Sequence, residues 1–196
     1  MASLHQIFEP FNRQIELNPN DANAYLDRGY AYNGIKKHDK AIEDFTKAIE
    51  LNPNDANAYR NRGFAYNGRE KHDKAIEDFT KAIEFNPSDA EAYRNRGFAY
   101  RDRGDNDKAI EDFTKAIEFN PSDAEAYRNR GLAYNGIEAD EKAILDFTKA
   151  IELNPNDANA YHNRGSTYNG IEADEKARSD SDKAIELNPN LTPIMP

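Results

Sequence analysis

Arginine and asparagine side chains recur along this chain as neighbours, at equal intervals from one copy to the next. A carboxamide offers both a hydrogen-bond donor and an acceptor, so a row of asparagines can hold the backbone of an extended peptide whatever its sequence. Guanidinium groups beside them would favour carboxylates, and aromatic rings three residues after the asparagines would add apolar contacts. The rows contain Arg60, Asn61, Phe64, Asn67, Arg94, Asn95, Phe98, Arg101, Arg128, Asn129 and Asn163.

Residues for catalysis are scarce. The chain has no cysteine and only four histidines, which are His5, His38, His72 and His162. His38 and His72 occupy the same place in successive copies of the repeat, but no closed set of metal ligands accompanies them. No glycine-rich phosphate loop, nucleophile elbow or acid–base pair is present. We therefore expect a non-enzymatic protein without cofactor or metal.

The charge of the chain argues against a nucleic-acid partner. It has 26 basic and 36 acidic residues, for a net charge of −10, whereas nucleic acid requires a basic face. No stretch approaches the roughly 20 apolar residues that span a membrane. The first residues lack the basic and apolar regions of a secretory signal. We expect a cytoplasmic protein that binds neither nucleic acid nor membrane.

These rows belong to an internal repeat. The dipeptide Asn-Pro recurs with a constant step and no insertion, and fixed self-similarity of this kind indicates a repeat architecture. Its copies begin at Asn18, Asn52, Asn86, Asn120, Asn154 and Asn188. The expected organisation is a degenerate N-terminal capping helix at 1–17, five repeats spanning 18–187, and a C-terminal tail at 188–196. The repeats are 18–51, 52–85, 86–119, 120–153 and 154–187.

Each repeat contains two helical patterns joined by a short loop. In the second repeat, Asn54 or Asp55 should cap the first helix, while Ser88 and Ser122 in the next two repeats have the spacing of a capping box with a glutamate. Gly68 should end the first helix, because glycine readily adopts the left-handed conformation. Two such helices must be antiparallel neighbours, and the next repeat must cover their apolar stripe.

The repeat resembles the tetratricopeptide repeat. The residues that carry the resemblance in the second copy are Tyr59, Gly63, Tyr66, Ala75, Phe79, Ala82 and the closing Pro87. The resemblance implies an all-α, right-handed superhelical α-solenoid of antiparallel helix pairs, whose first helices line a concave groove. The arginine, asparagine and aromatic rows would then lie in that groove. Glu91 and Glu125 should partly neutralise nearby arginines, which would leave Arg60 and Arg101 as the freer cations.

One departure from the family pattern is an arginine before the glycine of each first helix, with an aspartate at a constant separation in the second helix. Buried charges normally come in pairs, so five bridges are expected between the two helices of each repeat. The pairs are Arg28–Asp44, Arg62–Asp78, Arg96–Asp112, Arg130–Asp146 and Arg164–Asp180.

The two ends depart from the pattern. The N-terminal segment carries an apolar helical stripe in register with the later second helices, and its helix should start, kink or break at Pro10. The stripe consists of Leu4, Ile7, Phe8, Phe11 and Ile15. In the fifth repeat, Arg178 and Ser181 replace the isoleucine and phenylalanine of earlier copies. A polar last helix is typical of a cap.

The leading hypothesis is a protein–protein interaction module that binds an extended peptide or partner helix, with acidic side chains, in the groove. The alternative is a self-associating or purely structural array, such as a fragment or an engineered idealisation. Self-association would use the chain ends.

Overall fold

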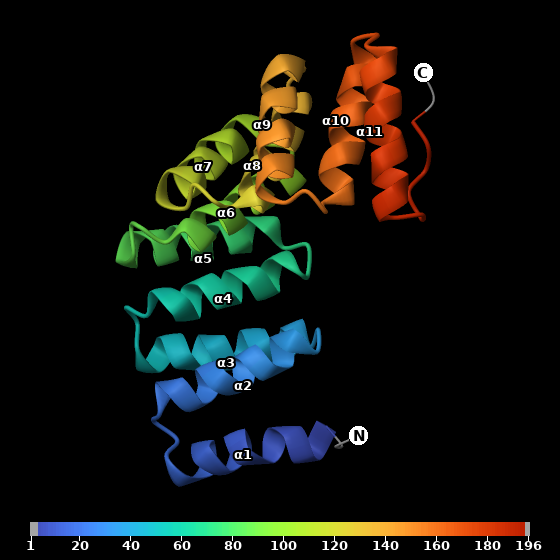
Figure 1. Ribbon diagram of the computed structural model, residues 1–196. Coiled ribbons are helices and arrows are strands. Elements are labelled where there is room, and N and C mark those ends of the chain that lie inside the picture. The colour runs from blue at the N-terminus through green and yellow to red at the C-terminus, as the bar shows by residue number, and fades with distance from the viewer. Residues whose placement is uncertain (1–3, 195–196) are drawn as a thin grey trace. The chain divides into compact units, whose positions relative to one another are not determined.

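The computed structural model describes residues 4–194, with side chains from Gln6 onward, and this part forms eleven α-helices and no strand (Figure 1). Two compact units are present, one ending at Ala99 and the other beginning at Tyr100. Unit 1 contains α1 (Leu4–Leu17), α2 (Ala22–Gly34), α3 (His38–Leu51), α4 (Ala56–Asn67), α5 (His72–Phe85) and most of α6 (Ala90–Asp102). Unit 2 continues with α7 (Asn106–Phe119), α8 (Ala124–Asn135), α9 (Asp140–Leu153), α10 (Ala158–Gly170) and α11 (Asp174–Leu187).

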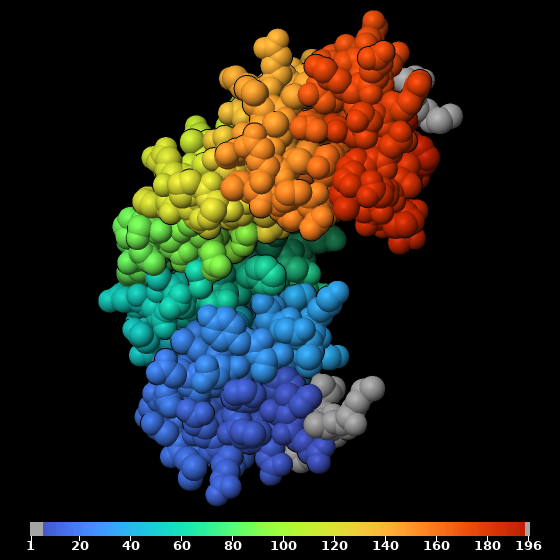
Figure 2. Space-filling view, viewed as in Figure 1, coloured from blue at the N-terminus to red at the C-terminus, as the bar shows by residue number. Residues whose placement is uncertain are grey.

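The helices pack as pairs within each unit. In unit 1, α2 packs on α3 and α4 on α5, and α3 joins the two pairs by packing on α4. The helices α1 to α5 form successive layers in Figure 1, and their side chains make one continuous body in Figure 2. In unit 2, α8 packs on α9 and α10 on α11, with α9 against α10. The predicted all-α solenoid of antiparallel helix pairs is confirmed.

The N-terminal helix α1 lies one full repeat before α3 and has the same length, in the register that the sequence predicted. It packs on α2, where Phe8 is buried and stacks on Tyr32 with ring centroids 4.2 Å apart. Pro10 lies inside α1, so the helix neither begins nor ends there. The Leu4 and His5 side chains lie outside the described residues.

Aspartates cap the first helices. The Asp55 carboxylate accepts hydrogen bonds from the backbone N–H groups of Asn57 and Ala58 at 2.9 and 3.3 Å, which satisfies two groups at the start of α4. The capping boxes expected at Ser88 and Ser122 are wrong. Asp89 and Asp123 accept the bonds from the backbone of their helices, and the serine hydroxyls donate to Asn86 and Asn120 instead.

The expected left-handed glycine after the first helix is also wrong. Gly68 has a right-handed conformation, with φ of −62°, and the left-handed residue is Glu70, with φ of 57°. The backbone N–H of Glu70 donates to the carbonyl of Asn67 at 2.9 Å, and that of Lys71 donates to the carbonyl of Tyr66 at 3.0 Å. These bonds close the turn with a non-glycine residue in the left-handed region.

A buried phenylalanine set against a glycine recurs in the core of each unit. Phe79 of α5 is fully buried, and a Cβ placed on Gly63 of α4 would lie 2.9 Å from its ring. Gly131 and Phe147 repeat this arrangement in unit 2 at 2.7 Å. The absence of a side chain on the first helix therefore lets the ring of the second helix approach its backbone.

Arginine side chains tie the two helices of a repeat together. The Arg62 guanidinium donates two parallel hydrogen bonds to the Asp78 carboxylate, both at 2.8 Å. Its third nitrogen donates to the Thr46 hydroxyl of the preceding second helix at 3.1 Å, a contact that the repeat pattern did not predict. In the first repeat, Arg28 makes the same contact with Asn12 of α1 at 2.8 Å. One guanidinium thus joins three helices.

Four of the five predicted bridges are confirmed: Arg28–Asp44, Arg62–Asp78, Arg130–Asp146 and Arg164–Asp180, at 2.7–2.8 Å. Arg96 and Asp112 belong to different units, so their bridge stays a prediction.

The electrostatics of the bridge explain why both partners are needed. The hydrogen bond to Asp44 raises the pKa of Arg28 above its ordinary value. Burial raises the pKa of the Asp78 carboxyl, and the hydrogen bond from Arg62 lowers it only in part. A lone aspartate at this position would therefore be an uncompensated charge in a desolvated place.

The C-terminal tail completes the last repeat. Ser181 stands where earlier second helices have phenylalanine, and the space against Gly165 is filled by Ile194. A Cβ on Gly165 would lie 2.7 Å from the Cδ1 atom of Ile194, and the Ile194 backbone N–H donates to the Ser181 hydroxyl at 2.9 Å. The tail thus supplies the apolar group that α11 lacks.

We expect Arg62→Met to destabilise the protein by about 3 kcal/mol, because it leaves Asp78 buried without a partner. The double variant Arg62→Met with Asp78→Leu should recover most of this loss, since a well-packed apolar pair can replace a buried ion pair. Chemical denaturation measures both. Lys81→Met, which removes an exposed ion pair with Glu84, is the control and should cost under about 0.5 kcal/mol. Equal losses for Arg62→Met and Lys81→Met would contradict the role of the bridge.

Ile194→Ala should lower the free energy of unfolding by about 1–2 kcal/mol, because it removes the carbon atoms of a half-buried side chain that pack against Gly165. Ser181→Phe should then restore stability in the Ile194→Ala background, since the ring can take the place that Phe147 has in the preceding repeat. In the wild-type background the same ring competes with Ile194 and should displace the tail, which limited proteolysis detects. Failure of Ser181→Phe to rescue would show that Ile194 does not occupy the phenylalanine site.

Candidate functional site

The predicted site residues all lie on first helices of the pairs. Unit 1 holds Arg60, Asn61, Phe64 and Asn67 on α4, with Arg94, Asn95 and Phe98 on α6. Unit 2 holds Arg101 at the end of α6, Arg128 and Asn129 on α8, and Asn163 on α10.

The arginines of this set connect protein groups to one another. Arg60 contacts Asp89 at 3.1 Å and Glu91 at 2.8 Å, so the expectation that Arg60 is a freer cation is wrong. Arg128 forms the equivalent ion pair with Asp157 at 2.7 Å and also lies 3.6 Å from Glu125, as predicted. Since Asp157 caps the next first helix, Arg128 braces consecutive repeats through that cap.

The second expected cation, Arg101, is also engaged. It donates to the Asn129 carboxamide at 2.5 Å and contacts Asp102 at 2.9 Å, so the prediction of a freer cation is wrong here too. Asn129 is 2% exposed and donates its own N–H to the Glu125 carbonyl at 2.6 Å. Asn129 therefore presents no carboxamide to a peptide in solution.

The asparagine row remains accessible in unit 1. Asn61 is half-buried and donates through its amide nitrogen to the Tyr30 hydroxyl and the Asn57 carbonyl, both at 2.6 Å. Its carboxamide oxygen makes no hydrogen bond to the described residues. Asn95, on α6, is half-buried as well, as is Asn163 in unit 2.

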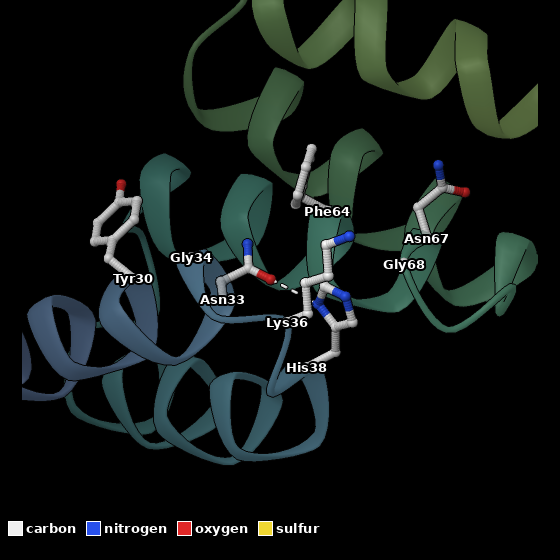
Figure 3. A pocket seen from close by; sticks show the side chains of 8 residues that line it. All are labelled: Tyr30, Asn33, Gly34, Lys36, His38, Phe64, Asn67 and Gly68. Atoms are coloured by element: carbon white, nitrogen blue, oxygen red, sulfur yellow. Dashed lines mark hydrogen bonds between the residues drawn. The ribbon is translucent and has the colours of Figure 1, made fainter. Parts of the chain in front are cut away.

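A pocket of about 650 Å³ opens between α2 and α4 in unit 1, and we name it the α2–α4 pocket (Figure 3). Tyr30 and Phe64 contribute aromatic surface and are 43% and 50% exposed. Lys36 lies in the loop after α2 with a left-handed backbone, φ 58°. The pocket is lined by Tyr30, Asn33, Gly34, Lys36, His38, Phe64, Asn67 and Gly68.

Histidines orient two asparagines of this pocket. His38 Nδ1 bonds the Asn33 amide oxygen at 2.8 Å, and His72 Nδ1 bonds the Asn67 oxygen at the same distance. An amide oxygen accepts, so Nδ1 carries the proton in both rings. Figure 3 shows the Asn33 oxygen directed at His38 and its nitrogen on the other side. The hydrogen bond to histidine thus fixes the orientation of each asparagine side chain and leaves its N–H₂ group as the part of the amide that can bond to another molecule.

The sequence pattern predicts only part of the lining of this pocket. Phe64 and Asn67 were predicted, whereas Lys36 was missed and His38 was considered only as a metal ligand. The signal for His38 was its place five residues after an asparagine, in both the first and second repeats. No group of metal-ligating side chains occurs in the described part of the chain. Nor does any described helix have the length and apolar character to cross a membrane.

Unit 2 lacks this arrangement. Asn135 corresponds to Asn33, but Asp140 replaces the histidine and cannot donate to the amide oxygen. The Asn135 nitrogen donates to the Thr167 hydroxyl at 2.8 Å, and its oxygen is buried without a partner in the described structure. The histidine-held pair of asparagines is therefore a feature of unit 1.

Comparison with protein-family models identifies the repeat. Models described as tetratricopeptide repeats match residues 22–55, 56–89 and 124–157, and others match 79–111 and 147–186. A further model, described as a TPR repeat, matches residues 98–136. The chain belongs to the tetratricopeptide repeat family. No curated protein matches it by sequence.

Solved tetratricopeptide repeat structures resemble the chain over most of its length. YrrB, whose crystal structure is known, has 28% sequence identity to this chain and a TM-score of 0.75. The aligned region covers 92% of this chain and 93% of the YrrB chain. A MamA structure is 27% identical with a TM-score of 0.77, covering 89% and 98% respectively. MamA from Desulfovibrio magneticus RS-1, at 22% identity and a TM-score of 0.80, covers 86% and 95% and supports the fold alone.

The His38 ring leaves no room for a side chain at position 68 of this tetratricopeptide repeat protein. A Cβ on Gly68 would lie 2.9 Å from the ring, so Gly68→Ala should push His38 away, release Asn33 and cost about 1–3 kcal/mol. Gly170→Ala is the matched control, because nothing lies within 4 Å of its Cβ. That variant should be neutral or slightly stabilising. Thermal unfolding measures both, and equal effects would contradict the close packing of His38 on Gly68.

Proposed function

We propose that the chain is a non-enzymatic interaction module that holds an extended segment of a partner protein over the α2–α4 pocket. The observation that carries the proposal is the exposure of Tyr30 and Phe64, 43% and 50%, on consecutive first helices. Aromatic rings left in water beside a pocket mark a surface that gains free energy when a partner covers it.

Polar groups around the rings support a peptide as the partner. An extended peptide presents alternating N–H and C=O groups that need partners when water is removed. The Asn61 oxygen can accept from such an N–H, and the nitrogens of Asn33 and Asn67 can donate to carbonyls. Because His38 and His72 already hold the two amides in place, little rotamer entropy is lost on binding.

The structural relatives agree with this kind of function. YrrB is described as a tetratricopeptide repeat protein with an unusual peptide-binding site, and its fold extends over 92% of this chain. We extend the proposed surface to Arg94, Asn95 and Phe98 of α6 within unit 1. In unit 2 we retain Asn163 as a separate candidate contact.

Self-association through a chain end is the second candidate. On α1, Leu17 is 78% exposed and Ile7 is 43% exposed. A cavity of about 530 Å³, lined in part by Pro10 and Leu17, lies on the same helix. The cavity on α1 has fewer aromatic side chains than the α2–α4 pocket, and it has no pair of asparagines held in place by histidines. We therefore favour the peptide-binding function.

The test is selection of random displayed peptides on the full chain, followed by affinity measurement in solution. Phe64→Ala should weaken the selected peptides at least tenfold, since a buried aromatic contact contributes about 1.5–3 kcal/mol. Leu145→Ala is the control, because Leu145 is 69% exposed on the second helix α9, and it should leave affinity unchanged. Selected peptides that bind Phe64→Ala as tightly as wild type would refute the site.

A further inference from the structure

One side of α1 is left uncovered by the described helices of unit 1. Its packing contacts are with α2, where Phe8 is buried and Phe11 and Ile15 are half-buried. The second helix α3, one repeat later, packs on both α2 and α4. In Figure 1, α1 is the outermost layer of unit 1, with no described helix of that unit beyond it. The side of α1 that corresponds to the α2-facing side of α3 is therefore open.

This side carries a mainly apolar stripe, which we name the α1 open face. Its members are three or four residues apart, as residues on one side of a helix are. All are exposed, with Leu17 at 78% and Ile7 at 43%, and a cavity of about 530 Å³ extends along them. Apolar groups left in water in this way gain free energy when another surface covers them. The open face consists of Ile7, Pro10, Gln14 and Leu17.

The open face does not fit a further first helix of the kind found in this chain. One repeat later, α3 has Asp44 in place of Pro10 and Ala48 in place of Gln14. Asp44 pairs with Arg28 of α2, and Ala48 is buried. A first helix packed on α1 would bury its arginine without a carboxylate and would meet the bulk of Gln14 where the repeats have alanine. Head-to-tail addition of another repeat is therefore disfavoured at this face.

Opposite charges lie along one edge of the open face. Glu9 and Arg13 are one helical turn apart, are both exposed and line the same cavity. Neither forms an ion pair with the described residues. A two-fold axis that reverses the direction of a helix keeps each side chain on its own side of the stripe, so Glu9 of one copy would come near Arg13 of the other. The edge is thus complementary to itself in an antiparallel pair.

We propose that a second copy of the chain covers the open face, through antiparallel two-fold pairing of the two α1 helices. Ile7 of each copy then packs near Leu17 of the other, and Glu9 of each pairs with Arg13 of the other. Such an interface is closed at two copies. Since each copy contributes one helix of 14 residues, the interface is small, and a dissociation constant on the order of 10 μM is expected.

The dimer gives the self-association candidate a surface and a geometry, and it is independent of peptide binding. It uses no residue that lines the α2–α4 pocket. Each copy in the dimer therefore keeps its own pocket, and two pockets on one dimer would bind a partner with two recognised segments more tightly than one pocket does.

Sedimentation equilibrium of the full chain over a concentration series tests the pairing. Wild type should pass from monomer to dimer and no further. Leu17→Glu should weaken dimerisation at least tenfold, because it places a charge in the apolar part of the interface. Leu145→Glu is the matched control, since Leu145 is 69% exposed on α9, and its dimerisation should equal that of wild type.

The charged edge tests the antiparallel geometry. Glu9→Arg and Arg13→Glu should each weaken dimerisation about fivefold or more, because each creates two contacts between like charges in the dimer. An equimolar mixture of the two variants should recover dimerisation, since opposite charges meet again at both contacts of the mixed pair. A mixture of Glu9→Arg with Leu145→Glu is the control and should not reach the same affinity.

The contrary outcomes are distinct. A wild type that stays monomeric at every concentration would overturn the dimer and the self-association candidate together. Equal dimerisation of Leu17→Glu and Leu145→Glu would overturn pairing through α1 and leave self-association through another surface. Loss in both charge variants without recovery in their mixture, or no loss in either, would contradict the antiparallel geometry. Peptide affinity that depends on Phe64 is unaffected by all of these results, so the peptide function stands or fails separately.

Discussion

The rest of the structure depends on the hydrogen bonds made by the arginine that precedes the glycine of each first helix. Its guanidinium makes a bidentate pair with an aspartate of the same repeat and a third bond to the preceding second helix, as in Arg62 with Asp78 and Thr46. Tyr59 and Tyr66 lie on the same guanidinium, at 5.6 and 5.9 Å from their ring centroids. Five N–H donors in a fixed plane suit this task, and a lysine could not perform it.

The third bond of this arginine couples the folding of each repeat to that of the repeat before it. A repeat that lost its neighbour would lose one hydrogen bond to threonine but keep its own ion pair, so the charge would stay compensated. The first repeat illustrates the point, because Asn12 of α1 replaces threonine as the partner of Arg28. At the other end, the cap aspartate has become Leu191 and the arginine that would pair with it has become His162. Both members of the inter-repeat pair change where no further repeat follows in this sequence.

The sequence predicted what depends on periodicity. The helix pairs, the register of α1 and the Arg–Asp bridges follow from residues at fixed separations. Residues 16 positions apart, such as Arg62 and Asp78, face each other across the two helices of one repeat. Contacts between repeats were harder to predict. Arg60 was expected to be available because the local sequence shows no carboxylate one turn away, but Asp89 lies 29 residues later. The role of Ile194 was also missed, since it depends on how the tail folds back and not on any repeat spacing.

The candidate site arises where the repeats differ. The first position of the second helix holds His38 and His72 in the first two repeats, then Asn106, Asp140 and Asp174. Histidine can donate to an amide oxygen and so orient an asparagine, whereas aspartate only accepts and leaves the Asn135 oxygen unpartnered. One substitution at a repeated position thus changes the asparagine five residues earlier from a fixed donor into a group bonded within the array. Since the scaffold contacts are the same in both units, the array can carry a binding pocket in one repeat pair and not in another without altering its fold.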